Sequence, residues 1–220
     1  MMQRYSWQDD TAITEMSKLL QGGGVLAGSS DTVFGLLSLA NDFGKKRLDE
    51  IKGRQDKPYL ILAQSFDVVA RVVDSAQLLQ VEKLLRVCWP GPLTVIFKPS
   101  LYAQSFYAPS YMNTVPGSWT IAVRVPKHAG LQKLLAQTGL LFSTSANKTG
   151  QPVPTTIDQM DADIVRQVDG IVLDGTEKSS TLLTPSTIID VTGDKLVMVR
   201  EGAYSKVELE STLGAGDKSF

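Results

Sequence analysis

The sequence is poor in the residues on which most metal and redox chemistry depends. Among 220 residues it has one cysteine, Cys88, and one histidine, His128. A single cysteine excludes an intramolecular disulfide, and a zinc site rich in His or Cys is close to excluded. No G-x-S-x-G segment accompanies His128, so we expect it to cap a helix or lie at the surface, and Cys88 to lie in the core. The chemistry therefore depends mainly on Lys, Arg, Ser, Thr, Asn and carboxylates.

Neither a strong excess of charge nor a long apolar run is present. The 22 Lys and Arg nearly balance the 23 Asp and Glu, for a net charge of −1. This balance excludes a wholly basic nucleic-acid coat and an acidic disordered chain, but it allows a local basic cleft. The longest uncharged stretch, residues 99–123, is interrupted by Pro109 and Pro116 and does not predict a membrane span. Residues 1–10 lack the apolar segment of a signal peptide, so we expect a cytoplasmic protein.

Two common nucleotide-binding motifs are also missing. Gly22-Gly23-Gly24 begins a formal G-x-G-x-x-A match, but it precedes a predicted strand instead of joining a strand to a helix. We therefore interpret these glycines as the end of a helix. No Gly-Lys-Ser or Gly-Lys-Thr stands at the spacing of a P-loop.

Apolar periodicity predicts helices alternating with strands, which is typical of an α/β (α+β) domain. Helices are expected at residues 11–21, 42–51, 67–73, 76–87, 131–137 and 157–168, and strands at residues 25–27, 59–63, 93–97, 120–125, 140–143, 171–173, 187–191 and 196–199. Residues 102–119 predict a long loop, and residues 143–156 a hydroxyl-rich one. The last two strands, joined at Gly193-Asp194, predict a hairpin and hence a mixed sheet. We expect one domain over residues 1–210 and a frayed tail over 211–220.

Two polar clusters are candidates for an anion-binding site. Lys52, Arg54 and Lys57 lie within six residues between a helix and a strand, and their donors suit a polyphosphate. On spacing alone, a solvated charged loop explains this cluster at least as well. Residues 143–147 (Ser-Thr-Ser-Ala-Asn) follow a strand at its carboxyl end, where open α/β sheets bind ligands. Taken alone, that segment is better explained as a capped turn.

Taken together, the clusters resemble a known family. Lys52-Gly53-Arg54 with Ser145-Ala146-Asn147 resembles the paired K-x-R and S-x-N signature of the YrdC/TsaC family, the threonylcarbamoyl-AMP synthases. Five further segments resemble the family's patterns in the same order: GVLAGSSDTVFG (24–35), WPGPLT (89–94), AVRVP (122–126), STIID (186–190) and REG (200–202). The resemblance spans nearly the whole chain.

The resemblance implies both a fold and a reaction. The fold would be a single domain with a twisted, mixed parallel and antiparallel open sheet, flanked by helices around a concave, positively lined cavity. The reaction would convert ATP, bicarbonate and L-threonine to threonylcarbamoyl-AMP and pyrophosphate, with Mg²⁺ on the phosphates and few protein ligands to it. A transferase partner would then modify tRNA, and tRNA or double-stranded RNA is a further candidate partner.

The resemblance also assigns roles to individual residues. The implied catalytic residues are Lys52 and Arg54. The implied ATP contacts are Arg54, Lys57, Thr120, Asn147, Thr155 and Arg200, and the implied threonine contacts are Thr32, Arg124, Ser145 and Ser186. Two departures from the family pattern stand out. Ser29-Ser30-Asp31 replaces Pro-Thr-Glu and is expected to loosen the turn before Thr32. Leu62 stands near the position at which many family members carry a histidine.

Two alternative functions compete with the synthase. An RNA-binding paralogue would use the same concave surface without making the intermediate, but such paralogues tend to lack the S-x-N segment that this chain keeps. A carbamoyl-adenylate site of the hydrogenase-maturation type belongs to much larger multidomain proteins.

Overall fold

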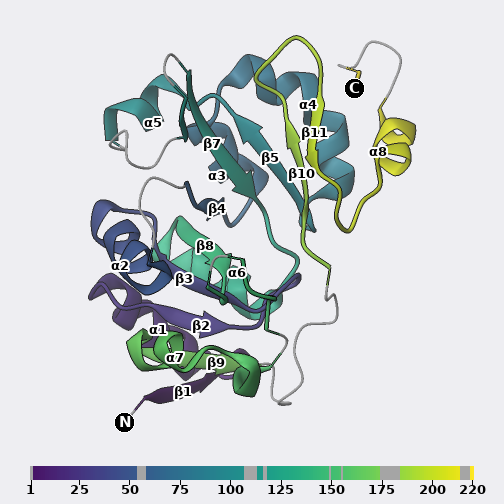
Figure 1. Cartoon of the computed structure of the whole chain (residues 1–220). Coiled ribbons are helices and arrows are strands. Elements are labelled where there is room, and N and C mark those ends of the chain that lie inside the picture. The colour runs from purple at the N-terminus through teal and green to yellow at the C-terminus, as the bar shows by residue number, and fades with distance from the viewer. Residues whose placement is uncertain are drawn as a thin grey trace.

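The chain folds around one long mixed sheet, shown in Figure 1 as a computed structural model. The structure describes residues 2–53, 58–106, 113–115, 118–148, 150–154, 156–173, 184–213 and 219–220. The strands are β1 (Gln3–Ser6), β2 (Leu26–Gly28), β3 (Gly35–Leu39), β4 (Leu60–Leu62), β5 (Leu93–Phe97), β6 (Asn113–Val115), β7 (Ser118–Arg124), β8 (Leu141–Ser145), β9 (Gly170–Leu173), β10 (Thr187–Asp190) and β11 (Val197–Arg200). The helices are α1 (Asp10–Gln21), α2 (Asp42–Lys52), α3 (Phe66–Val72), α4 (Ser75–Cys88), α5 (Leu101–Phe106), α6 (Ala129–Thr138), α7 (Ala162–Gln167) and α8 (Lys206–Thr212), with a 3₁₀ turn, η2 (Ile157–Gln159).

The sheet is mixed, as expected, and its strand order is β1-β9-β2-β3-β8-β4-β7-β5-β10-β11, with β6 paired to β7. Neighbours run parallel at β1/β9, β9/β2, β4/β7 and β5/β10, and antiparallel at the other pairs. The predicted hairpin of β10 and β11 is confirmed. In Figure 1, β1 lies at the end of the molecule that carries the N-terminus, and β11 lies near the C-terminus.

Local capping explains where several helices begin and end. The Asp9 carboxylate accepts a backbone hydrogen bond at the start of α1, and α1 ends at Gly22, which confirms the glycines as a helix terminus. α2 starts at Asn41 and ends at Gly53, whose φ of 58° is left-handed and favours glycine. At the start of α6, His128 Nδ1 accepts a hydrogen bond from the Leu131 N–H, so the expected capping role is confirmed.

Some predicted elements were wrong. Residues 102–119 contain most of α5, as well as β6 and the start of β7, instead of one long loop. Residues 143–145 belong to β8, so the hydroxyl-rich loop begins three residues later than expected. Residues 157–168 are divided into η2 and α7, because Asp161 caps a second helix start. The patterns also missed β1, β3 and α8, which are short or directly follow a loop motif.

The apolar residues form two clusters. The smaller one joins α1 and α6 to strands at the β1 side of the sheet, through Met16, Leu20 and Leu131 among others. The larger one includes Phe34, Phe97 and Phe142 and extends to α2, α4 and α8. Cys88 is buried in this larger cluster, which confirms its predicted core position. Burial raises the pKa of its thiol to about 11.

The remaining predictions of organisation concern the chain ends and the membrane. α8 crosses residue 210, and the Leu196 N–H donates to the Ser219 carbonyl over 2.9 Å. The domain range of 1–210 and the tail of 211–220 stay predictions. Within the part of the chain that the structure describes, no helix combines the length and apolar character needed to cross a bilayer.

Candidate active site

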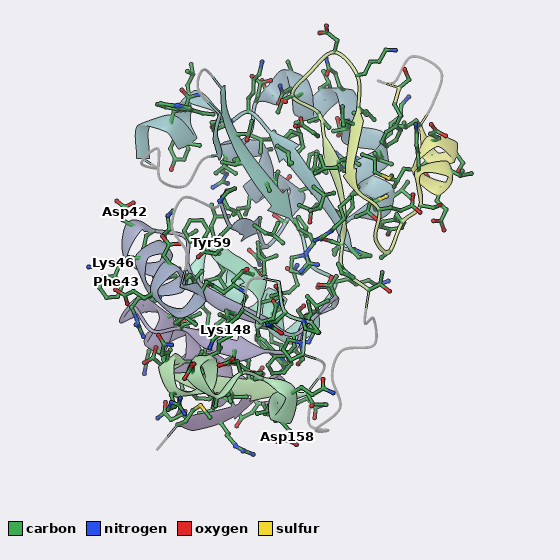
Figure 2. All side chains as sticks on the ribbon, in the orientation of Figure 1. Asp42, Phe43, Lys46, Tyr59, Lys148 and Asp158 are labelled. Carbon is green, nitrogen blue, oxygen red and sulfur yellow. The ribbon has the colours of Figure 1, made fainter. Side chains whose placement is uncertain are left out.

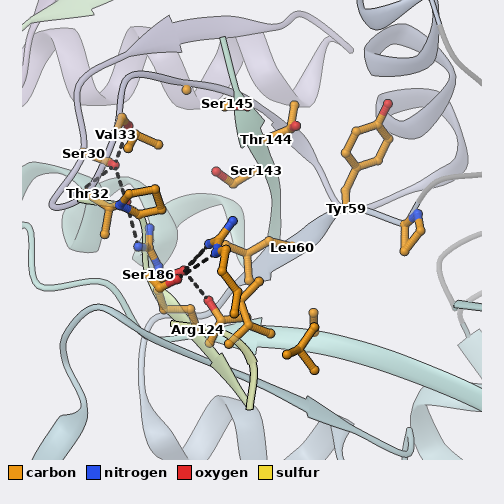
Figure 3. Close-up of a pocket in the computed structure, with 18 of the residues that line it drawn as sticks. Ser30, Thr32, Val33, Tyr59, Leu60, Arg124, Ser143, Thr144, Ser145 and Ser186 are labelled. Carbon is orange, nitrogen blue, oxygen red and sulfur yellow. Dashed lines mark hydrogen bonds between the residues drawn. The ribbon is translucent and has the colours of Figure 1, made fainter. Parts of the chain in front are cut away.

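A cavity of about 350 Å³ lies against the central strands of the sheet. Residues of β3, β4, β5, β7, β8, β10 and β11 line it, together with residues of the turn before β3. In Figure 3, Ser143, Thr144 and Ser145 lie on one side, and Arg124 and Ser186 lie on another. The strands therefore bring polar groups from distant parts of the sequence to one place.

The lining combines an apolar part with a few polar groups. The apolar residues include Leu60, Ile96, Ala122, Ile188 and Val199. The charged side chains among the described lining residues are Arg124 and Arg200, and none of those lining residues is Asp or Glu. A site with this composition suits a small anionic ligand that carries an apolar portion.

Arg124, at the end of β7, is the more deeply buried of the two arginines, with 2% of its surface exposed. Its Nη1 donates to Thr32 Oγ1 over 2.8 Å, and its Nη2 lies 3.2 Å from Asp31 Oδ1. Burial lowers the pKa of Arg124, and the nearby Asp31 carboxylate opposes that shift. Because arginine titrates so far above neutrality, Arg124 keeps its charge and can bind a carboxylate.

Hydrogen bonds hold each of the three residues that replace Pro-Thr-Glu before Thr32, contrary to the expected loosening of this turn. The Trp7 indole N–H lies 3.2 Å from both the carbonyl and the hydroxyl of Ser29. Ser30 Oγ donates to the Val33 carbonyl over 2.9 Å, and Asp31 Oδ2 accepts from a backbone N–H. These hydrogen bonds restrain the turn without a proline.

Arg200 and Ser186 meet on the β10–β11 side of the cavity. Arg200 Nε and Nη2 donate to the Ser186 carbonyl over 3.1 and 2.8 Å, and the Ser186 hydroxyl lies 2.8 Å from Thr94 Oγ1. The Arg200 residue as a whole is exposed, but its guanidinium group is partly buried, and this burial lowers its pKa. Thr94 was missed as a site residue, although its position at the end of the WPGPLT segment was a usable signal.

The two halves of the K-x-R and S-x-N signature touch each other. Lys52, only 5% exposed, donates from Nζ to the Ser145 carbonyl over 2.7 Å and also to the Asn147 carbonyl. The Ser145 hydroxyl donates to Asn147 Oδ1 over 2.5 Å, and Asn147 Nδ2 donates to the Gln151 carbonyl. Lys52 therefore supports the S-x-N segment and is not part of the cavity lining.

The cation that follows the S-x-N segment is engaged elsewhere. Lys148 Nζ lies 3.1 Å from an Asp161 oxygen and 2.6 Å from an Asp163 oxygen, and Figure 2 shows Lys148 beside α7. Hydrogen bonds to Asp163 and Asp161 raise the pKa of Lys148. Tyr59, which directly precedes β4, lines the cavity, and its hydroxyl donates to Asp49 of α2 over 2.7 Å.

The structure brings together most of the site residues expected from the sequence. Six line the cavity: Thr32, Thr120, Arg124, Ser145, Ser186 and Arg200. Lys52 and Asn147 do not line it but contact Ser145, which does, and Arg54, Lys57 and Thr155 are outside the described residues. Leu62 is fully buried in the smaller apolar cluster and does not line the cavity, whereas Leu60 does. Ser143 and Thr144, which belong to the second polar cluster but had no assigned role, also line it, and Ser30 and Tyr59 line it without having been expected there.

Fold and cavity together define a class: an α/β protein with an open mixed sheet and an arginine- and hydroxyl-lined cavity at its centre. A model of the Sua5, YciO and YrdC proteins, described as telomere recombination, matches residues 18–202. The chain belongs to the Sua5/YciO/YrdC family, so the resemblance found in the sequence is confirmed.

Relatives with known names agree with this assignment. The threonylcarbamoyl-AMP synthase of Bacillus subtilis is 29% identical over 215 residues, which are 94% of this chain and 58% of that protein. The enzyme of the same name from Pyrococcus abyssi is 31% identical over 201 residues, covering 89% of this chain and 55% of that one. The structure of P. abyssi Sua5 complexed with L-threonine matches with a TM-score of 0.81 and 26% identity, over 97% of this chain and 61% of that chain. The chain thus spans less than two thirds of the length of these relatives.

Proposed function

We propose that the protein is a threonylcarbamoyl-AMP synthase, which joins ATP, bicarbonate and L-threonine and releases pyrophosphate. The observation that carries this proposal is the convergence of Arg124, Arg200 and Ser145 on one cavity. The relatives that bear the name of this activity, and the Sua5 complexed with L-threonine, support it.

In this proposal, Arg124 binds the carboxylate of L-threonine. Its Nη1 and Nη2 are oriented by Thr32 and Asp31, and each nitrogen has a second hydrogen to donate. A carboxylate can accept two parallel hydrogen bonds from such a fork. The hydroxyls of Ser145 and Ser186 lie in the same cavity and would bind the amino and hydroxyl groups of the substrate.

ATP would bind at the Arg200 end of the cavity, with Thr120 and Asn147 as further contacts. Arg54, Lys57 and Thr155, carried over from the family pattern, complete the proposed nucleotide contacts. Pro58, which follows Lys57 in the sequence, lines the cavity. Lys52 would act on this end through the S-x-N carbonyls that it holds.

The chemistry needs positioning and charge neutralisation more than a protein base. The threonine amine and bicarbonate combine to a carbamate with loss of water, and a carbamate oxygen then attacks the α-phosphorus while pyrophosphate leaves. Arg200, Arg54 and Lys57 would neutralise the charge that develops on the phosphates. Mg²⁺ on ATP would share that task. The described lining residues offer it hydroxyl and carbonyl oxygens, so its main ligands would be the phosphates.

Threonylcarbamoyl-AMP as the product implies a transferase partner and a cellular compartment for the reaction. A transferase must accept the threonylcarbamoyl group and pass it to tRNA, because a mixed carbamic–phosphoric anhydride is hydrolysed readily in water. ATP, tRNA and bicarbonate are all available in the cytosol, which is where we place the reaction.

Pyrophosphate release by the purified protein tests the proposal. ATP, L-threonine, bicarbonate and Mg²⁺ are omitted one at a time, and the adenylate product is identified by its mass. Release should require all four, and Arg54→Ala or Arg124→Gln should abolish it. Arg47→Gln is the matched control, because Arg47 lies outside the cavity and contacts Glu50 and the Gln167 carbonyl. ATP binding without threonine-dependent release would overturn the proposal.

A further inference from the structure

Asp31 lies directly behind the arginine that faces the cavity. Its Oδ1 is 3.2 Å from Arg124 Nη2, and its Oδ2 accepts a hydrogen bond of 2.8 Å from the Lys127 backbone N–H. The Asp31 side chain is 6% exposed, and it is not among the described residues that line the cavity. A ligand in the cavity would therefore meet Arg124 and not Asp31.

The Asp31 carboxylate offsets the free-energy cost of burying the Arg124 guanidinium. A buried charge without a partner is strongly unfavourable, and Arg200 adds a second positive charge at the same cavity. Of these charged side chains, Asp31 alone offers Arg124 an opposite charge at short range. Without it, repulsion and desolvation would both favour movement of Arg124 away from its present position.

The contacts of Arg124 also define its orientation. Thr32 accepts from Nη1, and Asp31 approaches Nη2, so neighbouring residues of one turn hold both ends of the fork. Within the described residues, Arg124 Nε and Asp31 Oδ1 have no hydrogen-bond partner, although both are buried. The pair is therefore held by charge and by the rigid turn more than by a saturated set of hydrogen bonds.

We propose that Asp31 is a positioning residue that makes the Arg124 end of the cavity selective for a carboxylate over a phosphate. The paired Arg124 presents an oriented fork with little net charge, which suits a planar carboxylate that accepts two directed hydrogen bonds. A polyphosphate is attracted chiefly by net positive charge, and among the described lining residues the other positive charge is that of Arg200. Asp31 thereby separates the amino-acid end from the nucleotide end. This inference rests on the proposed function.

The test compares Asp31→Asn with Asp31→Glu in steady-state pyrophosphate release. In Asp31→Asn, a displaced Arg124 should lose one charge-assisted hydrogen bond to the threonine carboxylate, so the KM for L-threonine should rise about tenfold or more. The KM for ATP should stay within about twofold. Inorganic phosphate should compete with L-threonine about tenfold more strongly in this variant, because Arg124 then has no counter-charge. Asp31→Glu restores the carboxylate and should behave as the wild type in both respects.

Asp169→Asn is the matched control. Asp169 also accepts from a backbone N–H, that of Val25, and lies near an arginine, Arg47, but it is outside the cavity. An equal rise in both KM values in Asp31→Asn would overturn the proposal, because a general structural defect would act that way. Unchanged inhibition by phosphate would also overturn it, because Asp31 would then have no effect on the choice between carboxylate and phosphate.

A spectroscopic measurement separates this inference from the proposed function. Hydrogen exchange of the Arg124 Nε–H, followed by NMR without any ligand, should be slow in the wild type and at least about tenfold faster in Asp31→Asn. If the wild type releases no pyrophosphate, the synthase assignment fails, and this exchange rate still decides whether Asp31 positions Arg124. Unchanged exchange in Asp31→Asn would refute the positioning role whatever the activity.

Discussion

Replacement of Lys52 by methionine tests whether this lysine acts as a clamp or as a direct substrate contact. Lys52→Met keeps most of the side-chain volume but removes the ammonium that donates to the Ser145 and Asn147 carbonyls. Because these carbonyls are partly buried, each one left without its donor costs about 1–2.5 kcal/mol, so the free energy of unfolding should fall by about 2–5 kcal/mol. For a chain of this length, that loss corresponds to a fall in Tm of about 5–15 °C.

Thermal unfolding followed by circular dichroism measures this loss, and pyrophosphate release measures activity in the same preparations. Lys148→Met is the control, because Lys148 is a nearby lysine in solvent-exposed ion pairs, and its replacement should leave Tm nearly unchanged. We expect Lys52→Met to lose stability and activity together. A variant that unfolds at the wild-type temperature but is inactive would refute the clamp and indicate direct contact with substrate.

Three further predictions concern other groups. Arg124→Lys should raise the KM for L-threonine about tenfold or more with little change for ATP, because lysine lacks the planar fork; steady-state kinetics measures both. Thr94→Val removes the buried hydroxyl that meets Ser186 and should cost about 1 kcal/mol of unfolding free energy, measured by urea denaturation. Thr192→Val is the comparison, because the Thr192 hydroxyl donates to Asp190 at a less buried position after β10. The pKa of Cys88 is raised to about 11 in the folded state from 9.0, so the thiol contributes stability that is fully present below pH 9 and is lost as the pH rises toward 11. Urea denaturation from pH 8 to 11 should show this loss in the wild type and less of it in Cys88→Ala.

Local patterns in the sequence predicted local structure well. The boundaries of β5 were predicted as observed, because its apolar run ends sharply at Pro92 and Lys98. The helix at 11–21 was also predicted closely, since one apolar face and a glycine terminus define it. In contrast, β3 lies among buried neighbours and has no polar alternation, so no period distinguishes it from the loop before it.

The candidate site was predictable in its members but not in its geometry. Family segments pointed to Arg124, Ser145 and Ser186, and the structure brings these residues to one cavity. Nothing in the sequence indicated that Lys52 would turn toward backbone carbonyls, or that Asp31 would lie behind Arg124. Such contacts depend on which strands become neighbours, and local periodicity carries no information about that.

Sequence separation gives the site an unusual dependence on the folding of the whole chain. The contacts Lys52–Ser145, Thr32–Arg124 and Thr94–Ser186 join residues 93, 92 and 92 positions apart. Each of these contacts closes a loop of this length, the three loops overlap in the sequence, and contacts of such high order form slowly. The cavity therefore has no local folding unit of its own. A ligand that occupies it is expected to protect the sheet from β3 to β11 against unfolding, because binding is linked to the native state of all these strands at once.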